Sequence, residues 1–252
     1  MSVTDAAMML QVLKQPDARD WTALPPDPRD DTLGLHDGIR GWRIAYSPTL
    51  GYARQVHPEI AKAIDEVART LQDLGAVVER VDPGFEDPLE ICTGLWFAGA
   101  WQVWRQLSEQ QQALADPDFK AQALTGQQLG ADVLHTLHQR RGLLGSHMRQ
   151  FMTRYDLLLT PSVAVPAFEV RAPGSVPMTP EAMLGWTPFS YPFNLTQQPA
   201  ITVPCGLTSD GLPMGMQLVG PMFGDAQVLR GARAYESTRV TPRPSLSFAS
   251  NA

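Results

Sequence analysis

A strand–helix–strand pattern between residues 42 and 81 constrains the fold most strongly. Its helix begins at Pro58 and Glu59, because proline fits a first helical turn and the carboxylate complements the helix dipole, and Gly75 is placed to end it. The flanking segments Trp42–Tyr46 and Ala76–Val81 predict short strands. Apolar residues of the helix form one stripe: Ile60, Ile64, Val67, Leu71 and Leu74. Such a helix buries its stripe on a sheet, so the pattern predicts an α/β fold.

Three more segments complete the predicted sheet. Tyr155–Thr160 is an apolar run that ends at a proline, and it predicts a buried strand. Ala200–Pro204 and Met214–Val219 predict two strands joined through Asp210-Gly211, a pair typical of hairpin turns. Helices are expected at 3–14, 87–112, 127–154 and 225–235. The predicted fold class is therefore a mixed β-sheet flanked by helices.

The length of 252 residues suits a single domain, 1–252. Residues 15–31 are rich in proline and aspartate, and we expect a long loop there because proline removes a backbone donor and blocks helix. Residues 163–180 are Pro-rich and are expected to lack regular structure. Residues 241–252, with two prolines and several serines, are expected to form a loose tail.

Charge and cysteine content narrow the classes of partner. The net charge of −6 argues against a nucleic-acid groove or an anionic membrane surface as the main partner. No apolar run approaches the length of a membrane span, and the amino-terminal segment reads as a helix rather than a signal peptide. Cys92 and Cys205 stand far apart and outside any metal-binding pattern, as is typical of buried thiols in a reducing compartment. We therefore expect a cytoplasmic protein.

Three groups of side chains have a structural and a functional interpretation. Phe97, Trp101 and Trp104 share one helical face, which favours core packing over an apolar substrate channel. His57 precedes Pro58 at a helix start, which favours a capping or surface residue over a catalytic base. His135 and His138, with Asp132 one turn earlier, could hold a metal ion. The three residues span nearly two turns and no fourth ligand is evident, so a solvated helix face is favoured and no metal is expected.

Two segments near the carboxyl terminus carry a family resemblance. Residues 191–206 read YPFNLTQQPAITVPCG and residues 211–221 read GLPMGMQLVGP. Together they resemble a hallmark of the amidase-signature family, which includes bacterial amidases and the amidotransferase subunit that supplies ammonia for transfer-RNA-dependent Gln or Asn formation. Residues 155–161, 43–46 and 3–10 resemble other family segments in the same order. The resemblance covers nearly the whole chain and implies the C-terminal half of that fold, hence a partial domain.

The resemblance also marks two departures from the family. Gln197 stands where the family usually has glycine, and if that position has a positive φ, Gln197 must distort the turn or change its type.

The larger departure concerns catalysis. The family hydrolyses amides with a Ser–Ser–Lys triad, in which the lysine acts as base through a bridging serine. The only lysines here are Lys14, Lys62 and Lys120, no Ser-Ser dipeptide occurs, and the family's catalytic loop lies upstream of the segment matched by residues 3–10.

Two serines remain as weaker nucleophile candidates. Ser146 follows a glycine but lacks the glycine spacing of a nucleophile elbow, and Ser162 follows a predicted strand without a predicted base beside it. We therefore expect no catalytic residue in this chain, no cofactor, and no activity of the chain alone.

The resemblance implies a substrate channel to which this half contributes a wall. Trp186, Thr187, Phe189 and Asn194 are the residues expected to line it. Glutamine-using relatives carry an acidic residue near the position of Thr187, so its absence favours a broad or apolar amide substrate. Two alternatives stay open: a non-catalytic binding or assembly module, and a truncated product without a role of its own.

In the full family fold, the N-terminal half supplies further strands of the sheet. The C-terminal half without those strands should leave a sheet edge or an apolar face uncovered. Surfaces of this kind favour pairing. We therefore expect self-association, as a two-fold dimer, or binding to a chain that carries the N-terminal half.

Overall fold

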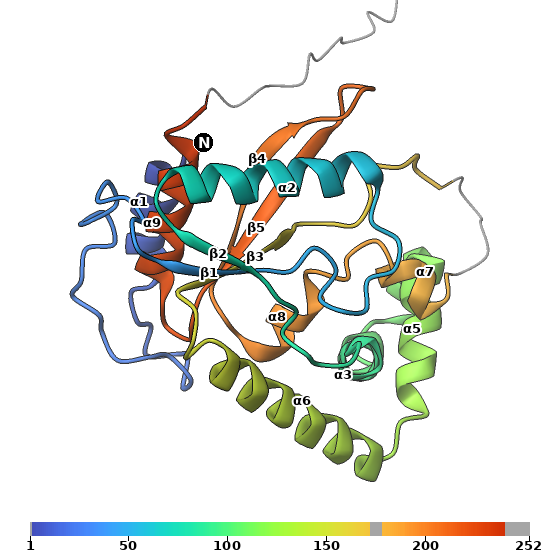
Figure 1. Ribbon diagram of the computed structural model, residues 1–252. Coiled ribbons are helices and arrows are strands. Elements are labelled where there is room, and N and C mark those ends of the chain that lie inside the picture. Colours follow the sequence, from blue (N-terminus) through green and yellow to red (C-terminus); the bar gives the residue numbers. More distant parts are fainter. Residues whose placement is uncertain (1, 172–177, 240–252) are drawn as a thin grey trace, which may run out of the picture.

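The computed structural model describes residues 2–171 and 178–239, and a single mixed sheet lies at their centre (Figure 1). The strands are β1 (Arg43–Tyr46), β2 (Val77–Arg80), β3 (Leu157–Pro161), β4 (Ala200–Leu207) and β5 (Pro213–Val219). Their order is β2-β1-β3-β5-β4. β1 runs parallel to both β2 and β3, whereas β5 is antiparallel to β3 and β4. The predicted mixed sheet is confirmed, with strand ends that differ by a few residues.

One face of the sheet is covered by α2 (Pro58–Asp73) and α9 (Asp225–Glu236), and α1 (Val3–Leu13) packs against α9. The predicted stripe of α2 is buried from Ile60 to Leu71 and joins Leu157 and Leu159 of β3 in one core. Gly75, with φ +92°, follows the end of α2 as predicted. The apolar stripe and the glycine that follows it therefore predicted the position of α2 correctly.

The opposite face is covered by α6 (Ala131–Phe151) and α8 (Tyr191–Thr196), which lie below the sheet in Figure 1. Leu158 of β3 points into this second core, where it joins Met148, Phe151 and Phe193. Successive residues of β3 thus enter different cores, and the strand is buried along its whole length.

A helical lobe extends from this second layer. It consists of α3 (Leu89–Trp104), α4 (Glu109–Leu114), α5 (Pro117–Gln127) and α7 (Pro180–Leu184). The prediction of one helix over 87–112 is wrong, because the helix ends at Trp104 and restarts after Ser108, which forms a capping box with Gln111. α5 and α7 were not predicted.

The aromatic face of α3 packs mainly inside the lobe. Phe97 and Trp104 are buried, and the Trp104 ring lies 5.8 Å from that of Phe119 on α5. The two helices approach closely at Gly126, where an added Cβ would clash with the Phe97 carbonyl oxygen. Trp96, by contrast, is exposed. Core packing therefore accounts for Phe97 and Trp104.

Residues 15–31 contain no helix or strand, and they fold back onto α1. α7 begins at the end of the Pro-rich stretch 163–180, part of which lies outside the described residues. The predicted loose tail, 241–252, also lies outside them. None of the described helices is both long and apolar enough to cross a membrane.

Candidate functional site

Polar side chains gather at the carboxyl end of β3. Gln217 of β5 donates its Nε2 hydrogens to Thr160 Oγ1 at 3.1 Å and to the carbonyl oxygen of Phe189 at 2.8 Å. Next to it, Ser162 Oγ donates to Thr202 Oγ1 of β4 at 3.1 Å. These bonds join β3, β4 and β5 to the segment that precedes α8, and we call Thr160, Ser162, Thr202 and Gln217 the hydroxyl–amide cluster.

A glycine makes room for Ser162 in this cluster. The backbone N–H of Ser162 donates to the carbonyl oxygen of Gly215 at 3.0 Å, and a Cβ at Gly215 would lie 2.8 Å from Ser162 Oγ. Ser190 Oγ approaches the carbonyl oxygen of Ser162 at 3.5 Å. Any larger residue at 215 would therefore displace the Ser162 hydroxyl from Thr202.

Three of the four predicted substrate-binding residues lie between α7 and α8, in the segment that bonds to this cluster through the Phe189 carbonyl, and Asn194 lies within α8. The indole of Trp186 is 40% exposed and meets the Phe168 ring edge-on at 5.7 Å. Thr187 is buried and donates its hydroxyl to the Leu184 carbonyl at 3.0 Å, and Phe189 is fully buried in the core. Asn194 is exposed and donates to the Ser190 carbonyl at 3.0 Å. Trp186 and Asn194 thus present side chains to solvent, whereas Thr187 and Phe189 support the fold.

The lysines of the chain lie apart from its candidate serines. Lys14 is engaged by the loop 15–31, where its Nζ donates to the Arg29 carbonyl at 2.6 Å. Lys62 lies on α2 and Lys120 on α5, while Ser162 lies beyond β3 and Ser146 on α6. Within residues 2–171 and 178–239, no hydrogen bond joins a lysine ammonium to a serine hydroxyl. Neither candidate serine, Ser146 or Ser162, therefore has a lysine base within hydrogen-bond reach among the described residues.

The histidines make no metal cluster in the part of the chain that the structure describes. His135, His138 and Asp132 all lie on α6. His57 occupies the position before α2 but makes no side-chain capping bond, and its Nδ1 is buried without a hydrogen-bond partner.

Gln197 keeps the backbone conformation that glycine would favour. It ends α8 with φ 61° and ψ 27°, in the left-handed region, and its N–H donates to the Phe193 carbonyl at 2.8 Å. The turn before β4 therefore holds a non-glycine residue in the left-handed region, at a cost in backbone strain.

Ser190, Thr202 and Gln217 were not singled out from the sequence. The sequence could have indicated the site through Thr160 and Ser162, which stand at the end of a predicted buried strand. Ligands of α/β sheets bind beyond the carboxyl ends of strands. Gln217 and Thr202 face this point only through the pairing of β5 with its neighbours.

Comparison with known proteins gives one consistent result. The Amidase family model matches residues 1–229. An acylamidase of Rhodococcus erythropolis is 32% identical over 250 residues, which cover 94% of this chain and 51% of that protein. A glutamyl-tRNA(Gln) amidotransferase subunit of Myxococcus xanthus is 30% identical over 260 residues, covering 93% and 53%.

Solved structures agree with these relatives. The crystal structure of a bacterial aryl acylamidase of the amidase-signature family superposes with a TM-score of 0.81 at 26% identity, covering 94% of this chain and 51% of that one. A 6-aminohexanoate cyclic dimer hydrolase shares the fold, with a TM-score of 0.84 at 21% identity and coverage of 96% and 55%. The chain spans about half the length of the curated relatives it matches. It belongs to the amidase-signature family.

Proposed function

We propose that this chain is the C-terminal, substrate-facing half of an amide hydrolase and that it does not hydrolyse amides alone. In this proposal the Ser–Ser–Lys triad is supplied by the other half of the enzyme, and the hydroxyl–amide cluster with Trp186 and Asn194 forms one wall of the substrate channel. The substrate is a broad or apolar amide, because the exposed side chains of this wall, Trp186 and Asn194, carry no charge. No metal or organic cofactor takes part.

The observation that carries the proposal is the separation of lysines from serines in a chain that spans about half of its relatives. Acyl transfer needs a nucleophile, a base within hydrogen-bond reach and donors for the oxyanion. Ser162 donates to another hydroxyl, Thr202 Oγ1, which cannot accept its proton as a general base.

The surface beside the cluster supports the presence of a partner. β4 lies at the end of the sheet order, so one of its backbone edges is unpaired among the described residues. Ala200, Thr202 and Pro204 of β4 are exposed on the face opposite α9. The outer face of α1, next to this edge, exposes apolar side chains: Met8, Met9, Val12 and Leu13. A second chain that extends the sheet would bury both features together.

An assay with a chromogenic aryl amide tests the proposal. The purified chain should release no 4-nitroaniline from 4-nitroacetanilide, whereas release should begin when the chain is combined with the half of the Rhodococcus acylamidase that this chain does not match. Turnover by the chain alone that disappears in Ser162→Ala or Ser146→Ala would contradict the proposal.

A matched pair of tryptophan variants tests the channel wall. Trp186→Ala should raise KM of the combined enzyme severalfold, because the exposed indole contacts the substrate. Trp21→Ala, in the loop 15–31 and 94% exposed, should leave KM unchanged. Equal KM values in the two variants would remove Trp186 from the channel.

A further inference from the structure

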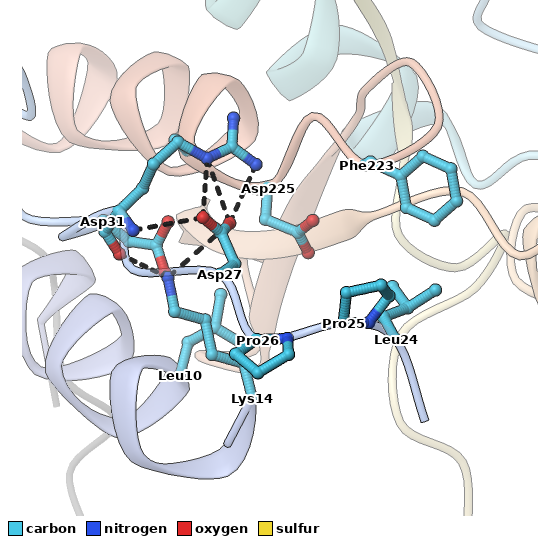
Figure 2. A pocket seen from close by; sticks show the side chains of 11 residues that line it. Leu10, Lys14, Leu24, Pro25, Pro26, Asp27, Asp31, Phe223 and Asp225 are labelled. Atoms are coloured by element: carbon cyan, nitrogen blue, oxygen red, sulfur yellow. Dashed lines mark hydrogen bonds and ion pairs between the residues drawn. The ribbon is translucent and has the colours of Figure 1, made fainter. Parts of the chain in front are cut away.

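A cavity of about 500 Å³ lies away from the hydroxyl–amide cluster, between α1, the loop 15–31 and the start of α9. Figure 2 shows this cavity from close by. Its volume lies within the range of small-molecule sites, roughly 300–1,000 Å³. Its lining contains none of the residues of the cluster, so a function of this cavity is independent of the proposed amide hydrolysis.

One side of the cavity is closed by paired charges. Lys14 Nζ lies 2.7 Å from Asp31 Oδ2 and 3.9 Å from Asp27 Oδ2. Arg29 forms a two-pronged bond to Asp27, with Nε 2.9 Å from Oδ1 and its second nitrogen 2.8 Å from Oδ2. The Arg29 guanidinium lowers the pKa of Asp27 to about 2, so both groups stay charged. These four side chains neutralise one another.

A fifth charged group lies outside this network. The side chain of Asp225, in the first turn of α9, makes no hydrogen bond or ion pair within the described part of the chain. The negative charge of Asp225 helps to raise the pKa of Arg29, but it is the smallest of the causes that do so. The start of α9 adds about half a positive charge, which offsets part of the carboxylate. The three aspartates and two cations of the lining therefore leave the cavity with a negative excess centred on Asp225.

The other walls are apolar. Leu10, Leu24, Pro25 and Pro26 line the cavity, and Phe223 stands across from the prolines. Figure 2 shows the Asp225 carboxylate turned toward the space between the Phe223 ring and this wall. Phe223 has φ 64° and is 58% exposed, so a bulky residue is held in the left-handed region at the cavity mouth. An aromatic face beside a carboxylate suits a cation.

We propose that this cavity binds a small organic ammonium ion with an apolar body. The ammonium group donates to the Asp225 carboxylate, the apolar body lies between Phe223 and the Pro25–Pro26 wall, and the paired charges of Lys14, Asp27, Arg29 and Asp31 close the far end. An anion is disfavoured by the excess negative charge, and a neutral molecule leaves Asp225 without a charged partner.

Calorimetric titration of the purified chain with three probes of one shape tests this assignment. The probes are 2-phenylethylammonium, 2-phenylethanol and phenylacetate at pH 7. The ammonium ion should bind at least about tenfold more tightly than the alcohol, because a hydrogen bond between two charged groups is stronger than one from a neutral hydroxyl. Phenylacetate should not bind. Equal affinity for the ammonium ion and the alcohol, or no binding of the ammonium ion, would overturn the proposal.

Two variants locate the site. Asp225→Asn should weaken 2-phenylethylammonium binding about tenfold or more and leave the alcohol unaffected. Asp210→Asn removes the same charge from the exposed β4–β5 turn and should change nothing. An unchanged Kd in Asp225→Asn would place the ligand elsewhere and overturn the proposal. Should that variant fail to fold, the comparison of the three probes on the unmodified chain still decides.

Discussion

β3 and β4 belong to one sheet and differ in how completely they are covered. β3 lies between β1 and β5, and all its residues are buried, with Leu158 facing one core and Leu157 and Leu159 the other. β4 lies at the edge, where Val203 and Cys205 face the core beneath α9 while the alternate residues are exposed. The centre of the sheet is thus complete and its β4 side is covered on one face only.

The edge also carries features that limit open-ended pairing. Pro204 lacks a backbone donor, and the pairing of β4 with β5 shifts register between Pro204 and Gly206. Proline and bulges are common means of blunting an edge strand. They leave Ala200–Val203 as the regular part of the edge, so we expect a partner to pair there.

The largest effect should come from the sheet centre. Leu158→Ala should lower the free energy of unfolding by about 3 kcal/mol, because a fully buried side chain leaves a cavity. Urea denaturation measures the loss. The control Leu143→Ala, at a side chain that is 71% exposed on α6, should change stability by less than about 0.5 kcal/mol. Similar losses in both variants would erase the distinction between centre and surface.

A charge on the exposed face of β4 should act on association instead. Ala200→Glu should weaken self-association or partner binding by about tenfold or more, since a buried carboxylate without a partner is costly. Stability of the separated chain should stay within about 0.5 kcal/mol. Sedimentation equilibrium measures the association of Ala200→Glu and of the control Ala131→Glu, which makes the same change at an exposed position of α6. If both variants associate equally well, the β4 face is not the contact.

Cys205, on the core-facing side of β4, should make the free energy of unfolding fall at high pH. Burial raises the pKa of the Cys205 thiol from 9.0 to about 11, so the folded chain keeps a proton that the unfolded chain releases. The stabilisation is complete below pH 9 and is lost as the pH rises through about 11. Between pH 8 and 10, the chain should lose roughly 1 kcal/mol of stability that Cys205→Ala retains. Identical pH dependence of the urea midpoints would refute this.

The smallest effect concerns the turn that leads into β4. Gln197→Gly should raise the free energy of unfolding by about 0.5–1 kcal/mol, because glycine adopts the left-handed conformation without strain. Thermal unfolding detects the gain, and Gln197→Ala should show none. A lower melting temperature for the glycine variant would mean that the glutamine side chain contributes more than the strain costs.

Local signals predicted most of the sheet layer. The leucine run of β3, the Gly75 stop and the Asp210-Gly211 turn each depend on neighbours in sequence, and each lies where predicted. The division of 87–112 was missed although Ser108 caps α4, because the aromatic residues before it continued a helical pattern. α5 was missed although Asp116 and Pro117 form a readable helix start.

The candidate site was less accessible from sequence. The 186–194 stretch was identified through its resemblance to the family, yet burial of Thr187 and Phe189 depends on the tertiary fold. The bond from Gln217 to the Phe189 carbonyl joins residues 28 positions apart, and no local pattern indicates it. The cavity beside Asp225 likewise combines three segments of the chain that meet only in the folded protein.

Sedimentation velocity of the purified chain at micromolar concentration, with a dye that binds apolar surface, tests the central claim most directly. The claim is that the β4 edge and the outer face of α1 are contact surfaces of a half enzyme. We expect a dimer or a larger assembly, and a drop in dye binding when the half of the Rhodococcus acylamidase that this chain does not match is added. A compact monomer that binds no dye would contradict the claim.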